Sequence, residues 1–272
     1  MKILLLDANN LIYRARYAAK FAREGDATIV YSFFRSLKPL MEKFSPDKCY
    51  FVRDGAPQDR IDLYSGYKAN RERNLDEKFL SQKRNIENIV LELLPIVYCR
   101  NMQVEADDLI AFLVNETHKE DECVVVSSDT DFIQLLQSHP NCKLYNPITK
   151  KFRECPEYDY LTWKSLRGDA SDNIPGIPRV GDKTAEKLAL NENKLEEFLK
   201  SESNLQIFNR NKELISFREL DTSQTFISDA VANFEQLKQI FTNYNFNSMV
   251  ADKYWQKYVG CFEGVLNENI AE

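Results

Sequence analysis

The sequence lacks the features of a zinc protein and of a membrane protein. It has only two histidines, His118 and His139, and no pair of its six cysteines shows Cys-x-x-Cys spacing. A zinc site is therefore not expected. The cysteines are instead expected to be reduced, buried thiols in a cytoplasmic protein. The apolar N-terminal run KILLLD is too short to span a bilayer and continues into polar sequence, so neither membrane association nor a signal peptide is expected.

Charge is unevenly distributed along the 272 residues. A net charge of −6 argues against a general nucleic-acid coat. Residues 60–84 nevertheless hold seven basic and four acidic side chains, a net charge of +3, with Tyr64 and Tyr67 among them. Such a segment is either a solvated helix face with ion pairs or a surface that grips phosphates and stacks on an unpaired base. The basic residues are Arg60, Lys68, Arg71, Arg73, Lys78, Lys83 and Arg84.

Short apolar runs alternate with helical periodicity over the first 160 residues. The runs cover residues 2–7, 48–54, 94–100, 123–129 and, more weakly, 143–147, and the helical stretches cover 9–22, 28–44, 76–93 and 106–117. This alternation predicts an α/β fold with a mainly parallel, buried sheet. After about residue 160 the strand signals fade, and residues 161–272 are expected to form a helical subdomain and a C-terminal region.

Acidic residues follow the predicted strands. Each alone is most simply a helix cap or a turn residue. In an open parallel sheet, however, the carboxyl ends of the strands share one edge, and that many carboxylates would repel one another unless cations neutralised them. Oxygen ligands without histidine or cysteine favour Mg²⁺ or Mn²⁺, and two such ions about 4 Å apart suit phosphodiester hydrolysis. The acids are Asp7, Asp54, Glu105, Asp107, Asp108, Asp129, Asp131, Asp169 and Asp172.

The run IPGIPRVGDKTAEKLA predicts a turn that leads into a helix. Gly176 and Gly181 are expected to permit a tight turn with close backbone approach, and the helix is expected to begin near Asp182. Its free N–H groups, with Lys183 and Lys187 nearby, could hold a DNA phosphate. A helix-turn-helix without that role is the alternative.

Six segments, in order, resemble the motifs of the 5′-nuclease (flap endonuclease) superfamily, in its bacterial and bacteriophage 5′→3′ exonuclease branch. They are LLLDANNLIYRA (4–15), FVRDGAPQDR (51–60), LYSGYKANR (63–71), VEADDLIA (104–111), VVVSSDTDFIQLL (125–136) and GDASDNIPGIPRVGDKTAEKLA (168–189). The resemblance implies a PIN-like core over residues 1–160, an arch or clamp over about 56–95, and a duplex-binding helix-turn-helix (helix-hairpin-helix-like) subdomain. It further implies a stand-alone, monomeric enzyme of a bacterial or phage-infected cell.

The resemblance also assigns roles to residues. It places Asp7, Asp54, Glu105, Asp107 and Asp129 in a first metal cluster and Asp131, Asp169 and Asp172 in a second, with Asp108 between them. Lys68 and Arg71 would act on the scissile phosphate, and Tyr67 would stack on the unpaired terminal nucleotide. DNA contacts are expected at Arg60, Tyr64, Arg73, Lys83, Arg84, Gly176, Arg179, Gly181, Lys183 and Lys187.

The implied activity is two-metal hydrolysis of DNA with a 5′ flap, a fork or a free 5′ end, and of RNA primers in hybrids, alongside replication proteins. A K⁺ ion at the turn is implied too, although Arg179 and Asp182 stand where the family often has glycine and proline, and Ala8 stands where many relatives have glycine. Two other functions remain open: a non-catalytic DNA-junction binder, and a PIN-type ribonuclease. The retained second-cluster acids weigh against the first, and the turn weighs against the second.

Overall fold

The sheet at the centre of the molecule has seven strands. The computed structural model describes residues 1–20, 27–71 and 76–268. Its strands lie in the order β6-β5-β4-β1-β2-β3-β9, with the inner five parallel and both edge strands antiparallel. The mainly parallel sheet predicted from the sequence is confirmed. The strands are β1 Lys2–Asp7, β2 Lys48–Arg53, β3 Val97–Asn101, β4 Glu122–Val126, β5 Cys142–Asn146, β6 Lys151–Phe152 and β9 Thr225–Ile227.

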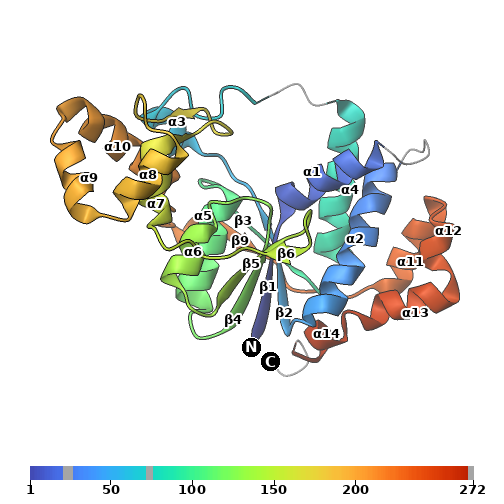
Figure 1. The fold of residues 1–272 in the computed structure, drawn as a ribbon. Coiled ribbons are helices and arrows are strands. Elements are labelled where there is room, and N and C mark those ends of the chain that lie inside the picture. Colours follow the sequence, from blue (N-terminus) through green and yellow to red (C-terminus); the bar gives the residue numbers. More distant parts are fainter. Residues whose placement is uncertain (21–26, 72–75, 269–272) are drawn as a thin grey trace.

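Helices cover both faces of this sheet, which explains why its strands are continuous apolar runs. Leu4 and Leu6 of β1 pack into the larger core, whereas Ile3 and Leu5 point to the smaller core on the other face. Figure 1 shows α1, α2 and α4 on the first face and α5 and α6 on the second. These helices are α1 Ala8–Ala19, α2 Thr28–Phe44, α4 Glu77–Leu93, α5 Ala106–Phe112, which continues as the π-helical turn Leu113–Thr117, and α6 Ile133–Ser138.

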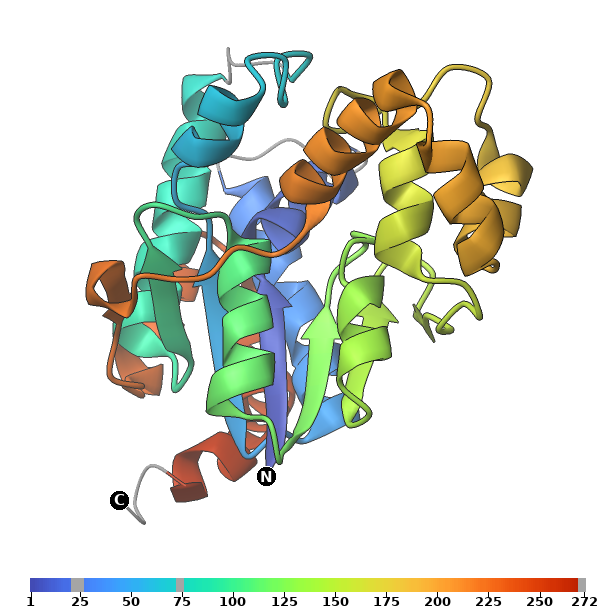
Figure 2. The same cartoon turned by 90° about the vertical axis from the view of Figure 1, so that its left-hand side faces the viewer.

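A separate helical lobe stands above the carboxyl edge of the sheet (Figure 2). It has its own small core, built around Leu166, Ala185 and Phe208. The short helix α3 Gln58–Leu63 packs against α10 of this lobe, while α4 packs against α2. The lobe contains α7 Tyr160–Arg167, the short strands β7 Gly168–Asp169 and β8 Ile174–Pro175, α8 Asp182–Ala189, α9 Glu192–Leu199 and α10 Glu202–Ile215.

The chain beyond α10 returns to the sheet. The strand β9 pairs with β3, and Leu237, Phe241 and Tyr258 enter the larger core beside α2. Residues 161–272, expected to form a helical subdomain and a C-terminal region, lie in two places in the structure (Figure 1). The elements are the 3-10 turn Thr222–Gln224, α11 Phe234–Asn243, α12 Asn247–Val250, α13 Asp252–Gly260 and α14 Glu263–Glu268. Within the described ranges no helix has both the length and the apolar character needed to cross a membrane.

Candidate active site

The predicted acids gather at the carboxyl edge of the sheet. Because β4, β1, β2 and β3 are adjacent and parallel, the residues that follow them meet at one edge. Asp7 ends β1, Asp54 follows β2, Glu105 and Asp107 stand at the start of α5 after β3, and Asp129 and Asp131 follow β4. The helical lobe adds Asp169 and Asp172 to the same edge.

Asp131, Asp169 and Asp172 form the most compact group. Each offers a carboxylate oxygen, these oxygens all lie within 4.8 Å of one another, and all three residues are buried. The ammonium group of Lys164 pairs with Asp131 and lies 2.6 Å from Asp169. Burial raises the pKa of Asp131 to about 7 despite this lysine. Asp169 is buried as well, but its ion pair with Lys164 and its hydrogen bonds from Ser171 lower its pKa to about 2.

Asp7, Asp54 and Asp129 form a neighbouring group that local hydrogen bonds hold in place. The hydroxyl of Ser127 donates to Asp7 at 2.8 Å, and the amide of Ala106 donates to Asp54 at 2.8 Å. The amide of Asp131 donates to Asp129 at 2.9 Å, which links the two groups. Burial, and then the nearby charges of Asp54 and Asp129, raise the pKa of Asp7 to about 7.

Glu105 connects the acids to the basic segment. Its carboxylate lies 2.5 Å from the ammonium group of Lys68 and accepts a hydrogen bond from the Tyr67 hydroxyl at 2.7 Å. Burial would raise the pKa of Glu105, but Lys68 and Arg60 outweigh it and lower that pKa. Burial and the adjacent Asp108 raise the pKa of Asp107 well above its usual range.

Lys68 and Arg71, the basic residues expected to act on the scissile phosphate, lie against Asp172. The ammonium group of Lys68 is 3.4 Å from Asp172, and the guanidinium of Arg71 is 2.5 Å from it. Both cations therefore stand beside the compact acid group, where they neutralise part of its charge and face the same space as its carboxylates.

Asp108 does not have a free carboxylate for a metal. Both its oxygens accept from the guanidinium of Arg60, at 2.6 and 2.7 Å, and the amide of Arg218 donates to one of them at 2.9 Å. The side chain is completely buried. The structure therefore places Asp108 in an internal ion pair, and the expectation of a metal ligand at this residue needs correction.

Two residues of the basic segment that were expected at the DNA surface are buried. Arg60 is 2% exposed and also donates to the carbonyl of Leu214 at 3.0 Å, so it ties α3 to α5 and α10. Tyr67 is 3% exposed, and its hydroxyl donates to Glu105. In this conformation neither side chain has a surface to offer to a phosphate or a base, because each is enclosed by the acids it contacts.

The other expected contact residues of this segment lie in different settings. Tyr64 is half-buried with the Arg210 guanidinium 5.0 Å from its ring centre. Lys83 donates to the side chain of Asn9 at 2.7 Å, and Arg84 is exposed on α4. Arg73 lies outside the described residues.

The turn before α8 has the predicted tight approach at Gly176. A side-chain carbon on Gly176 would stand 1.9 Å from the carbonyl oxygen of Arg167. Gly181 differs from the expectation, since a side-chain carbon there would meet no protein atom within 4 Å. The left-handed backbone of this turn falls instead on Arg179, at a φ of 67°. Helix α8 begins at Asp182 as predicted, with Lys183 and Lys187 exposed.

Lys164 and the polar side chains around the acids were not identified from the sequence. Lys164 lies in the run TWKSLRGD, on the buried face of the amphipathic helix α7. A lysine on a buried helix face was the available signal, because such a side chain is rarely enclosed without an acidic partner. The hydroxyls and amides of Ser127, Asn9 and Asn10 gave no comparable signal.

The donor set fits divalent metal ions. All the converging ligands are carboxylate oxygens, and His118 and His139 lie elsewhere, in contacts with Asp121 and the Lys119 carbonyl. Hard divalent cations prefer such oxygen ligands. Burial raises the pKa values of Asp7 and Asp131, and a bound divalent ion would supply the positive charge that offsets this deficit.

This deficit predicts a pH dependence of stability in metal-free protein. The folded chain holds protons on Asp7 and Asp131 up to about pH 7, whereas the unfolded chain releases them near pH 4. The free energy of unfolding in EDTA should therefore fall by a few kcal/mol as pH rises from about 4.5 to about 7.5. The lowered pKa values of Asp169 and Glu105 change the free energy of unfolding only below this pH range. Urea unfolding at several pH values measures this, and the double variant Asp7→Asn/Asp131→Asn should make the slope less steep, with a remainder from Asp107, whose pKa is also raised; an equally steep slope in that variant would contradict the assignment.

Comparison with known families accounts for nearly the whole chain. Residues 2–161 match the family described as 5'-3' exonuclease, N-terminal resolvase-like domain, and residues 155–252 match the 5'-3' exonuclease, C-terminal SAM fold. Among similar proteins, the thermostable DNA polymerase I of Thermus aquaticus is 33% identical over 234 residues, which is 82% of this chain and 28% of that protein. The DNA polymerase I of Mycobacterium bovis is 35% identical over 204 residues, 68% of this chain and 22% of that protein. The chain thus spans about a quarter of the length of these polymerases.

Solved structures share the fold over almost their full length. The T5 D15 protein co-crystallised with metal ions has a TM-score of 0.66 at 15% identity and covers 99% of this chain and 100% of its own. A T5 D15 flap endonuclease complex with DNA and metal ions has a TM-score of 0.62 at 17% identity, with the same coverage. The catalytic core of Rad2 with DNA has a TM-score of 0.57 at 15% identity and covers 89% of this chain and 87% of its own. With both family domains matched in order across the sheet and the helical lobe, the chain belongs to the 5'-3' exonuclease family.

Proposed function

We propose that the protein is a structure-specific 5′ nuclease that hydrolyses DNA with a 5′ flap, a fork or a free 5′ end, using two Mg²⁺ or Mn²⁺ ions. The observation that carries this proposal is the convergence of Asp131, Asp169 and Asp172 within 4.8 Å, next to Asp7, Asp54 and Asp129. The T5 D15 structures are named as a flap endonuclease and as complexes with metal ions and DNA, which supports the same substrate and cofactor here.

The bound ions would supply charge neutralisation and a more acidic water at the scissile phosphate. The chain's own residues would position that phosphate. Asp7, Asp54, Glu105, Asp107 and Asp129 would hold one ion and Asp131, Asp169 and Asp172 the other. Lys68 and Arg71 reach the same space and would donate to the nonbridging oxygens of the phosphate, where they oppose its growing negative charge.

The turn and the N-terminus of α8 would hold the duplex. Gly181 caps this helix, Asp182 begins it, and Lys183 and Lys187 lie within its first six residues, and all four residues are exposed. Free N–H groups at a helix start bind phosphate without reading sequence. The open space beside Gly181 leaves room for a DNA backbone to approach. We extend the proposal to a K⁺ ion at this turn, and to RNA in hybrids as a second substrate.

The duplex contact predicts a change in salt dependence. In the double variant Lys183→Ala/Lys187→Ala, flap affinity should fall, and the negative slope of log K against log salt should become less steep by about 1 to 2. The reason is that binding releases about one counterion for each phosphate contact, and the variant makes fewer contacts. Fluorescence anisotropy in EDTA measures both. The matched control is Lys253→Ala/Lys257→Ala, two exposed lysines on α13, which should leave the slope unchanged. Equal slopes for the two double variants would contradict the placement of DNA at α8.

Incubation of purified protein with 5′-labelled flap DNA tests the function directly. We expect cutting near the flap junction in Mg²⁺ or Mn²⁺ and none in EDTA. Tight flap binding without cutting under any divalent ion would instead support a non-catalytic junction binder. Preferential cleavage of single-stranded RNA would support a PIN-type ribonuclease.

A further inference from the structure

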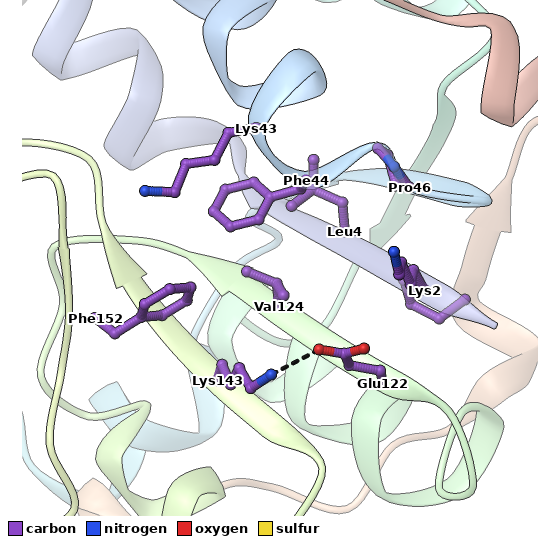
Figure 3. Close-up of a pocket in the computed structure, with 10 residues that line it drawn as sticks. Lys2, Leu4, Lys43, Phe44, Pro46, Glu122, Val124, Lys143 and Phe152 are labelled. Carbon is purple, nitrogen blue, oxygen red and sulfur yellow. Dashed lines mark hydrogen bonds and ion pairs between the residues drawn. The ribbon is translucent and has the colours of Figure 1, made fainter.

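A hollow lies at the amino-terminal edge of the sheet, opposite the edge that carries the acids (Figure 3). It has a volume of about 200 Å³ and is formed where α2 ends, over the first residues of β1 and β4. The rings of Phe44 and Phe152 flank Val124 in this hollow, and Leu4 lies beside Phe44 (Figure 3). Pockets for drug-sized ligands are usually larger, about 300–1,000 Å³, so this one suits a single side chain.

The rim of this hollow is basic and incompletely neutralised. Lys143 pairs with Glu122 at 2.7 Å, which the dashed line in Figure 3 marks. Lys2 and Lys43 also line the hollow, and neither forms an ion pair with a carboxylate among the described residues. Three lysines and one glutamate therefore line the hollow, with the Asp47 carboxylate held by the Lys2 backbone amide at 2.7 Å nearby, in a protein whose net charge is −6. The excess positive charge is local, and it complements a carboxylate-bearing ligand.

The ammonium group of Lys43 rests on aromatic rings instead of an acid. It lies 4.5 Å from the ring centre of Tyr145, 5.8 Å from that of Phe44 and 5.7 Å from that of Phe152. These contacts hold the charge at the mouth of the apolar hollow, where a carboxylate could reach it while an adjacent side chain enters. Phe152 is 46% exposed, so one wall of the hollow is accessible from solvent.

The same surface continues over the edge strand β6. Another hollow, on the far side of this strand, shares Lys143 and Phe152 with the first and adds Arg153, Leu136 and Cys155. The strand is only two residues long and forms one edge of the sheet. The two hollows therefore meet at Lys143 and Phe152, and Arg153 adds a further basic residue beside them.

We propose that this surface, from Lys2 and Lys43 to Phe152 and Arg153, binds a short acidic peptide segment of a partner protein, with one aromatic or large aliphatic side chain in the hollow. A peptide fits better than a nucleic acid because the hollow is apolar inside and admits one side chain. The site lies at the other end of β1 from Asp7, about 15–20 Å along the strand. A partner bound there would leave the carboxyl edge free for substrate.

Fluorescence anisotropy with a fluorescein-labelled peptide of five aspartates followed by a C-terminal phenylalanine tests the proposal. Saturable binding with a Kd of about 10–100 µM is expected, since one buried side chain and two or three ion pairs hold the peptide. Lys43→Glu and Phe152→Ser should each weaken binding at least about tenfold. The exposed Lys253 on α13 provides the charge-matched control Lys253→Glu, which should bind as the parent does. Flap-cutting rates should be the same in all three variants and the parent, which also shows that each is folded.

Control peptides separate the two parts of the site. Replacing phenylalanine by alanine, or the aspartates by asparagines, should each reduce affinity at least about fivefold. Absence of saturable binding up to about 1 mM peptide would overturn the proposal, and so would equal binding of the alanine peptide, which would indicate diffuse charge attraction. Displacement of the peptide by flap DNA, together with loss of flap affinity in Lys43→Glu, would assign the surface to nucleic acid and also overturn it.

Discussion

Replacing Asp172 by asparagine is expected to lower the rate of flap cutting at least about 10³-fold and to change flap affinity by less than about threefold. The substitution removes one of three carboxylates that lie within 4.8 Å of one another, and with it the charge that holds a divalent ion there. Duplex contacts are assigned to the turn and α8, which the substitution does not touch. The single asparagine oxygen can still accept from Arg71, and only the longer hydrogen bond of 3.3 Å from Tyr67 to the other oxygen is lost, so the fold around it should persist.

Single-turnover cutting in Mg²⁺ and anisotropy titrations in EDTA measure the two quantities separately. Asp229→Asn is the matched control, because Asp229 is an exposed aspartate on the C-terminal return of the chain. It should cut and bind as the parent does. Retention of more than about a tenth of the parental cutting rate by Asp172→Asn would show that the compact acid group does not serve the reaction.

The order of elements could be predicted from the sequence because each inner strand is a continuous apolar run. The apolar runs at 2–7 and 48–54 match β1 and β2 to within one residue, and the run at 123–129 starts one residue after β4 starts and ends three residues after it ends. The edge strands β6 and β9 were missed, since two or three half-exposed residues give no periodic signal. The return of residues 225–268 to the larger core was also missed, because an amphipathic helix such as α11 does not specify which surface covers its apolar face.

The acids of the site could be predicted because topology alone brings strand ends together. The basic residues that pair with those acids could not be predicted in the same way. Arg60 gives no sign of burial in its charged stretch, and the only signal for Lys164 is its place on one face of an amphipathic helix; the three-dimensional packing shows that both are buried against carboxylates. For the same reason Asp108 was assigned to a metal when its oxygens belong to Arg60.

Arg60→Met is expected to lower the free energy of unfolding by about 3–5 kcal/mol, because it leaves the carboxylate of Asp108 buried without its partner. The loss extends to the carbonyls of Leu214 and Ser216, which accept from the same guanidinium at 3.0 and 3.1 Å. Urea unfolding in EDTA at constant pH measures the change. Arg84→Met, an exposed arginine on α4, is the control and should alter stability by less than about 0.5 kcal/mol.

A double-mutant cycle with Asp108→Asn separates the ion pair from the loss of packing. If the pair is what Arg60 stabilises, the double variant should be more stable than the sum of the single changes predicts, by about 1–3 kcal/mol, because the neutral amide no longer requires a buried cation. Additive effects would mean that Arg60 contributes through its carbonyl contacts and its packed stem alone. An unfolding midpoint and slope in Arg60→Met equal to those of the parent would show that the guanidinium is solvated in solution, and Arg60 would then again be available to bind DNA.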